Sequence, residues 1–224
     1  LKDYATNAGV KGFVVGVSGG IDSAVTASLC ARTGLDVLLI EMPIHQAENQ
    51  VNRAWEHMRN LESGYPKVRT KNLNLTPVFE GFLKTLPQFP ESDSGKMALV
   101  NTRARLRMTA LYYFGQLNGL LVAGTGNKVE DFGVGFYTKY GDGGVDLSPI
   151  ADLVKTEVFA LGKTLGVPES ILVAPPTDGL WGDDRTDEDQ IGASYPELEW
   201  AMQQQGLGKS AIDFGGREKE VFEI

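Results

Sequence analysis

The chain has 224 residues, a length typical of one large domain, and its 42% hydrophobic and 22% charged residues are ordinary for a globular protein. This composition excludes collagen-like, low-complexity and largely disordered chains. The formal net charge of −8 argues against a general nucleic-acid-binding protein, and no apolar run approaches the roughly 20 residues that cross a bilayer. We expect one domain over residues 1–224, trimmed at both ends, with neither nucleic acid nor membrane as a partner.

Few cysteines and histidines limit the chemistry that is open to the chain. Cys30 is the one cysteine, so neither an internal disulfide nor a thiolate metal cluster can form, which is typical of a cytoplasmic protein. Its neighbours Leu29 and Ala31 predict a position in the core. With only His45 and His57 present, a histidine-rich metal site is excluded, and any metal would be held by carboxylates.

Strand and helix patterns alternate along the first half of the chain. Short apolar, β-branched runs predict strands at residues 13–17, 36–42, 67–73 and 120–124. Apolar residues at helical spacing or polar helix-forming stretches predict helices at residues 22–32, 46–60 and 96–117. Such alternation indicates a mostly parallel sheet between two layers of helices, so we expect a three-layer α/β/α, Rossmann-like fold.

The second half is less regular. Residues 124–144 are rich in glycine and too long for an ordinary connection, which predicts a functional loop. Helices are expected at residues 153–165 and 195–205. Residues 175–179 and the acidic run at residues 183–189 are interpreted as surface loops, the latter as a solvated acidic face.

A glycine- and serine-rich segment joins the first predicted strand to the first predicted helix: Gly16-Val17-Ser18-Gly19-Gly20-Ile21-Asp22-Ser23. Glycines let the backbone approach a phosphate, a helix N-terminus attracts anions, and the two serines add hydroxyl donors. The segment has neither the lysine of a Walker loop nor the glycine spacing of a dinucleotide fingerprint. Its carboxylate, Asp22, can face phosphates if a divalent cation lies between them. The alternative interpretation is a tight turn capped by Ser18.

This segment resembles the pyrophosphate loop of the N-type ATP pyrophosphatases. Members of that group adenylate a carbonyl oxygen of their substrate and release pyrophosphate, so the resemblance implies formation of AMP and the adenine nucleotide alpha hydrolase-like fold. NAD synthetase, GMP synthetase, asparagine synthetase and several tRNA-modifying enzymes share the loop. The loop alone therefore predicts the type of reaction and not the substrate.

Three further blocks resemble NAD synthetase of the ammonia-dependent type, in the same order. They are NTRARLRM at residues 101–108, GTGNKVE at residues 124–130 and GFYTKYGDGGVD at residues 135–146. The resemblance implies an ATP-dependent amidation of deamido-NAD by ammonia, which gives NAD, AMP and pyrophosphate. It also implies Mg²⁺ as the cofactor and a homodimer as the assembly.

The resemblance also assigns roles to individual residues. Asp22 and Glu130 are expected to bind Mg²⁺, and Lys155, Thr125 and Thr177 to contact ATP together with the loop. Asp22 and Lys155 are expected to take part in catalysis.

Four other positions are assigned on the substrate side. Arg105, Lys139 and Asp146 match positions that hold deamido-NAD, and Asp142 is a candidate for positioning ammonia or accepting a proton. Between the Gly-Thr turn and the Thr-Lys-Tyr-Gly-Asp block, this chain has one residue more than the common bacterial pattern of the family. Asp131 therefore remains an alternative metal ligand to Glu130.

The pattern of the family is not matched everywhere. Arg103, Arg105 and Arg107 cannot all share one helix face, so one or two of them are expected to be surface charges. The His-Lys pair that the family places on the dinucleotide is missing after Glu188. Cys30 lies inside a predicted helix and does not suit a glutaminase nucleophile, which favours ammonia as the nitrogen source. The remaining alternatives are a GMP synthetase-like or tRNA-modifying enzyme and a non-catalytic adenine-nucleotide-binding module.

Overall fold

The computed structural model describes residues 1–87, 92–177 and 186–224. The described residues form a parallel sheet with the strand order β3-β2-β1-β4. The strands are β1 (Gly12–Gly16), β2 (Asp36–Glu41), β3 (Val68–Asn72) and β4 (Leu120–Val122). The order reverses between β1 and β4, and ligands of open parallel sheets bind at the carboxyl ends of the strands at such a point.

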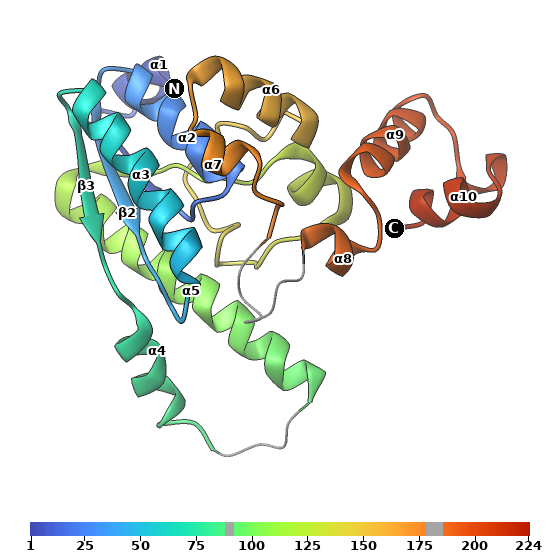
Figure 1. The fold of residues 1–224 in the computed structure, drawn as a ribbon, viewed down its shortest axis with the longest axis horizontal. Coiled ribbons are helices and arrows are strands. Elements are labelled where there is room, and N and C mark those ends of the chain that lie inside the picture. The colour runs from blue at the N-terminus through green and yellow to red at the C-terminus, as the bar shows by residue number, and fades with distance from the viewer. Residues whose placement is uncertain (88–91, 178–185) are drawn as a thin grey trace.

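Helices cover both faces of the sheet, as the sequence predicts. Because successive side chains of a strand point to opposite faces, β1 contributes to two cores. Phe13 and Val15 pack with residues of α2 (Ile21–Arg32) and α3 (Glu48–Gly64). Val14 packs on the other face, against α4 (Thr76–Leu83) and α5 (Asp93–Asn118). Figure 1 shows α2 and α3 on the side of the sheet opposite to the long α5.

The remaining helices pack against α2 or belong to the C-terminal part of the chain. The N-terminal helix is α1 (Lys2–Asn7), and α6 (Lys155–Leu165) and α7 (Glu169–Leu172) pack on α2. The C-terminal elements are α8 (Asp187–Ile191), α9 (Tyr195–Gly206), a 3-10 turn (Ala211–Asp213) and α10 (Gly216–Phe222). Figure 1 places α9 and α10 at the end of the molecule away from β3. No helix in the described ranges has both the length and the apolarity that crossing a membrane requires.

Two of the predicted loops need correction. The segment at residues 124–144 contains a π-helix, η1 (Val129–Val134). The sequence does not predict it, because the segment is rich in glycine and six residues are too few for a periodic pattern. Within the acidic run, residues 183–185 lie outside the described residues, but Asp187 begins α8 and is buried. The interpretation of Asp187 as part of a solvated face is therefore wrong. Its burial depends on packing that a run of charges cannot reveal.

Candidate active site

The glycine-serine loop follows β1 and begins α2 in the predicted way. The backbone N–H of Ser18 donates to Ser23 Oγ at 3.2 Å, the backbone N–H of Gly20 donates to Ser18 Oγ at 3.3 Å, and Ser23 Oγ donates to the Gly20 carbonyl at 3.0 Å. Gly19 has φ +83, and a Cβ there would lie 2.4 Å from the carbonyl oxygen of Gln50. Glycine is thus required because α3 packs directly on the loop.

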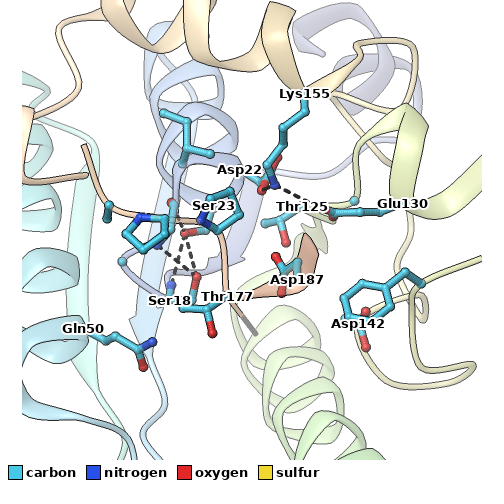
Figure 2. A pocket seen from close by; sticks show the side chains of 18 of the residues that line it. Ser18, Asp22, Ser23, Gln50, Thr125, Glu130, Asp142, Lys155, Thr177 and Asp187 are labelled. Carbon is cyan, nitrogen blue, oxygen red and sulfur yellow. Dashed lines mark hydrogen bonds and ion pairs between the residues drawn. The ribbon is translucent and has the colours of Figure 1, made fainter. Parts of the chain in front are cut away.

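A buried lysine joins two carboxylates from distant parts of the chain. Lys155, at the start of α6, is 2% exposed, and its Nζ lies 2.6 Å from Asp22 Oδ2 and 2.8 Å from Glu130 Oε1. Figure 2 shows these three side chains pointing toward one another from α2, η1 and α6. The packing therefore brings together the three residues that the sequence analysis assigns to metal binding and catalysis.

The charges in this network affect one another's ionisation. Burial alone would lower the pKa of Lys155, but the carboxylates of Asp22 and Glu130 raise it above its ordinary value, so the ammonium is retained. Burial raises the pKa of Asp22, and this effect exceeds the lowering by Lys155. Burial, together with the charges of Glu130, Asp142 and Asp22, also raises the pKa of Asp131 to about 6. The site is thus rich in carboxylates that an added cation would stabilise.

Asn127 holds the two metal-ligand candidates in place. It is fully buried, and its Nδ2 donates to Asp22 Oδ1 at 3.1 Å. Its Oδ1 accepts from the backbone N–H groups of Val129 and Glu130 at 3.0 and 3.1 Å, which caps the start of η1. The sequence analysis did not predict this role, because a single asparagine after a Gly-Thr turn has no signal of its own.

Tyr195 reaches the same network from the start of α9. Its hydroxyl donates to Glu130 Oε1 at 2.5 Å and to Asp187 Oδ2 at 3.3 Å, and the Lys155 Nζ lies 4.6 Å from the centre of its ring. Burial and the neighbouring carboxylates raise the pKa of Tyr195, so the hydroxyl keeps its proton. Both Tyr195 and Asp187 were missed as site residues. A tyrosine at the start of an amphipathic helix looks like an ordinary core residue.

The geometry bears on whether Glu130 or Asp131 is the second metal-ligand candidate beside Asp22. Glu130 shares the Lys155 ammonium with Asp22, whereas Asp131 lies beside Gly126, where a Cβ would come within 2.1 Å of Asp131 Oδ2. The arrangement favours Glu130 as the partner of Asp22.

The oxygen donors of the site suit magnesium only in part. In the described ranges, no group of three or more His, Cys, Asp or Glu side chains converges on a metal site. Two carboxylates, those of Asp22 and Glu130, do converge through Lys155. Mg²⁺ is commonly held by one or two carboxylates together with substrate phosphates and waters, so this donor set suits the ion when a nucleotide is bound.

Two adjoining cavities open at the carboxyl edge of the sheet. The smaller has a volume of ≈ 160 Å³ and contains the loop residues 18–23 together with Thr125, Glu130 and Lys155. The larger, of ≈ 500 Å³, is lined by Gly16, Val17 and side chains of α5. Both are lined by a common set of predicted site residues: Ser18, Thr125, Asp142 and Thr177. A ligand with a phosphate tail and a bulky body could extend across the two.

The predicted dinucleotide residues lie elsewhere, on an exposed strip along α5. Arg105 Nε donates to the carbonyl oxygen of Lys139 at 3.2 Å. Asp146 accepts from the Tyr112 hydroxyl at 3.0 Å and from the backbone N–H of Val122 at 2.8 Å. Arg105 and Tyr112 are seven residues apart and therefore share one face of the helix. Neither cavity is lined by Arg105, Lys139 or Asp146.

The three arginines of α5 point to three different partners, as their spacing requires. Arg103 lies over the ring of Phe79, with 5.0 Å between Cζ and the ring centre, and Arg107 Nε donates to the Met42 carbonyl at 2.9 Å. Arg105 contacts the Lys139 segment.

Cys30 is fully buried, as predicted, and burial raises the pKa of its thiol to about 12.

Known proteins share the sequence of this chain over most of its length. The model of the NAD synthase family matches residues 1–218. The chain belongs to the NAD synthase family. It is 42% identical over 199 residues to the NH3-dependent NAD+ synthetase of Methanococcoides burtonii, which covers 87% of this chain and 72% of that relative. The corresponding NAD+ synthetase of Methanosarcina mazei is 38% identical over 201 residues, covering 89% and 76%.

A solved structure shares the fold of this chain. The structure of NMN synthetase from Francisella tularensis has a TM-score of 0.86 and 35% sequence identity, and the match covers 100% of this chain and 87% of that one. The resemblance to NAD synthetase and the predicted fold class are both confirmed.

Proposed function

We propose that the chain is an ammonia-dependent NAD synthetase, a ligase that uses ATP to convert the carboxylate of deamido-NAD into an amide. The observation that carries the proposal is the lysine-free loop facing the Asp22–Lys155–Glu130 network within a chain of this family. In the first step, a carboxylate oxygen of deamido-NAD bonds to the α-phosphorus of ATP, and pyrophosphate leaves with the electron pair of the broken bond. Ammonia then attacks the acyl carbon, AMP leaves, and a proton is released.

The residues of the chain bind and orient the reactants. The loop amides and the hydroxyls of Ser18 and Ser23 suit the phosphate oxygens, and Thr125 and Thr177 line both cavities along the path of the nucleotide. Lys155 is held in its ammonium form and can contact phosphate oxygens as the nucleotide enters. Asp142 lines both cavities and is proposed to position ammonia or to accept the released proton.

Asp22 and Glu130 are the residues we propose to hold Mg²⁺. When bound, the ion offsets the negative charge of the phosphates during their departure. Asn127 and Tyr195 keep the two carboxylates oriented through hydrogen bonds that involve no substrate.

The exposed strip on α5 is proposed to bind the dinucleotide. The cations Arg105 and Lys139 suit its phosphates, and Asp146 suits its ribose hydroxyls. Because the strip is exposed, we further propose that a second copy of the chain covers it, so that the active enzyme is a homodimer. We expect the enzyme to work in the cytoplasm.

A product assay tests the function. The purified chain is incubated with ATP, Mg²⁺, ammonium chloride and one acceptor, and AMP and amide product are quantified by chromatography. The acceptors are deamido-NAD, nicotinate mononucleotide and xanthosine monophosphate. Equal amounts of AMP and NAD from deamido-NAD are expected. Nicotinate mononucleotide is included because the Francisella structure is that of an NMN synthetase. Turnover of that acceptor alone would replace the dinucleotide as substrate, and AMP from none of them would contradict the proposal.

A further inference from the structure

Arg53 is a cation at the phosphate loop that the sequence analysis did not single out. It lies on α3, its Nε donates to the carbonyl oxygen of Gly19 at 3.3 Å, and it lines the smaller cavity together with loop residues 18–20. The contact is supported by the close packing of Gly19 on α3 near Gln50. Arg53 is therefore fastened to the turn that the phosphates of ATP are proposed to contact.

The charges around this cavity are unevenly paired. Among the described residues, its lining contains five carboxylates, those of Asp22, Glu130, Asp131, Asp142 and Asp187. The cations in the described part of the lining are Lys155 and Arg53. Lys155 is shared by Asp22 and Glu130, whereas Arg53 forms no ion pair with any carboxylate of the described residues. Of the two, Arg53 is the one whose charge is not already balanced by a described carboxylate.

The guanidinium has donors to spare. Arginine carries five N–H groups in a planar fork, and the Gly19 carbonyl accepts from Nε alone. Within the described ranges, the Nη groups of Arg53 donate no hydrogen bond to another residue. A planar fork with two unused amino groups suits two oxygens of one phosphate group.

We propose that Arg53 binds the departing pyrophosphate. This inference rests on the proposed function, since it assigns a ligand to the same loop. As the bond between the α-phosphorus and its bridging oxygen breaks, the electron pair remains on that oxygen, and negative charge increases on the pyrophosphate. A fixed guanidinium close to those oxygens stabilises the charge without moving a proton. Arg53 is then a catalytic residue supplied by α3 in place of the lysine that the loop lacks.

The test measures binding of the two products separately. Isothermal titration calorimetry is done with pyrophosphate plus MgCl₂ and, in a second series, with AMP, on the wild type, Arg53→Gln, Arg53→Lys and Arg59→Gln. Arg59 is a matched control on α3, because it is exposed and lies over the ring of Trp55. Binding of pyrophosphate and of AMP can be measured without turnover, so the result does not depend on which acceptor is amidated.

The expected result separates a phosphate ligand from a support for the loop. One or two charge-assisted hydrogen bonds predict that Arg53→Gln weakens pyrophosphate binding roughly tenfold to a hundredfold. Binding of AMP should change by less than about twofold, because AMP lacks the departing group, and Arg59→Gln should change neither. Equal weakening of both ligands, or unchanged pyrophosphate binding, would overturn the proposal.

Arg53→Lys keeps the test decisive if Arg53→Gln does not fold. Lysine keeps the charge but not the fork, so its pyrophosphate affinity should lie between those of the wild type and a neutral variant, with AMP binding preserved. A loss of AMP binding equal to that of pyrophosphate in Arg53→Lys would also overturn the proposal. If the proposed function failed but this inference held, the acceptor assay would give no AMP while wild-type pyrophosphate binding still exceeded that of the variants.

Discussion

Charged residues are arranged in two different ways in this chain. One group is the Asp22–Lys155–Glu130 network around the buried Lys155, and the other is the exposed strip of Arg105, Lys139 and Asp146. In the network, Lys155 is 2% exposed and each charge has a partner within the same chain. On the strip, Arg105 and Lys139 are exposed. The buried groups are organised before a ligand arrives, at a cost in desolvation. The exposed groups keep their hydration, and binding must organise them.

This difference predicts that substitutions in the network affect folding and catalysis together, whereas substitutions on the strip affect substrate binding alone. The Asn127 and Tyr195 hydrogen bonds tie the network to η1 and α9, so its loss should spread into the C-terminal helices.

Replacing Lys155 by Met should have the largest effect. Asp22 and Glu130, whose side chains are 17% and 14% exposed, would lose the buried cation that pairs with both of them. Removing one partner of a buried pair destabilises a fold by about 3–5 kcal/mol. Urea denaturation followed by circular dichroism measures the loss, and AMP release should disappear. Lys163→Met is the matched control, because Lys163 lies exposed on the same helix. Unchanged stability of Lys155→Met would mean that the ion pairs contribute nothing to the fold.

On the strip, Arg105→Gln should weaken substrate binding and leave the fold intact. Losing one charge-assisted contact should raise the KM for deamido-NAD roughly tenfold, and the KM for ATP should stay within about twofold. Steady-state kinetics with each substrate varied in turn measures the two effects, and thermal denaturation checks stability. A change in the KM for ATP of the same size would show that the strip and the cavities are one site.

The sequence predicts the local elements of this site better than its long-range contacts. The strand before Ser18 and the helix after it follow from an apolar run, two glycines and a polar helix start, all within about 20 residues. Residues Asp22, Glu130 and Lys155 were assigned through family resemblance, because their mutual contacts span up to 133 positions. No periodic pattern reports such contacts.

Other features of the candidate site depend on packing that leaves no local signal. Arg53 belongs to a polar helix, and only the docking of α3 on Gly19 shows that it reaches the loop. Asp187 was hidden within a charge run, although it begins α8 and accepts from the Tyr195 hydroxyl. The strand order that brings β1 next to β4 is likewise a property of the whole chain.

Tyr195→Phe should have a smaller effect that separates orientation from charge. The ring stays over Lys155, but Glu130 and Asp187 lose a shared donor, which predicts a loss of about 1–2 kcal/mol in stability. The Mg²⁺ concentration for half-maximal activity should rise, and the KM for deamido-NAD should not. Tyr113→Phe, at an exposed tyrosine of α5, is the control. An unchanged magnesium requirement would show that Glu130 needs no help from α9.

Glu41 is a buried carboxylate that pairs with no lysine of the described residues, so it contrasts with the Asp22–Lys155–Glu130 network. It is 3% exposed, accepts from Asn72 Nδ2 at 2.5 Å, and burial raises its pKa from 4.5 to about 7 despite the opposing charge of Arg107. A raised folded-state pKa contributes stability below pH 4.5 that is lost as the pH rises to 7.

Glu41→Gln should therefore stabilise the fold at high pH and not at low pH. The rise in the pKa of Glu41 from 4.5 to about 7 corresponds to about 3 kcal/mol at most. Because Glu41 lines the larger cavity, solvent screening should reduce the gain to about 1 kcal/mol. Urea denaturation of wild type and variant at pH 5 and pH 8 measures the gain as a difference between the two conditions. In Glu41→Gln the side-chain oxygen can still accept from Asn72. A gain in the free energy of unfolding that grows with pH is therefore due to removal of the ionised Glu41 carboxylate. An equal gain at both pH values would instead assign it to packing, and the contrast between paired and unpaired buried carboxylates would be lost.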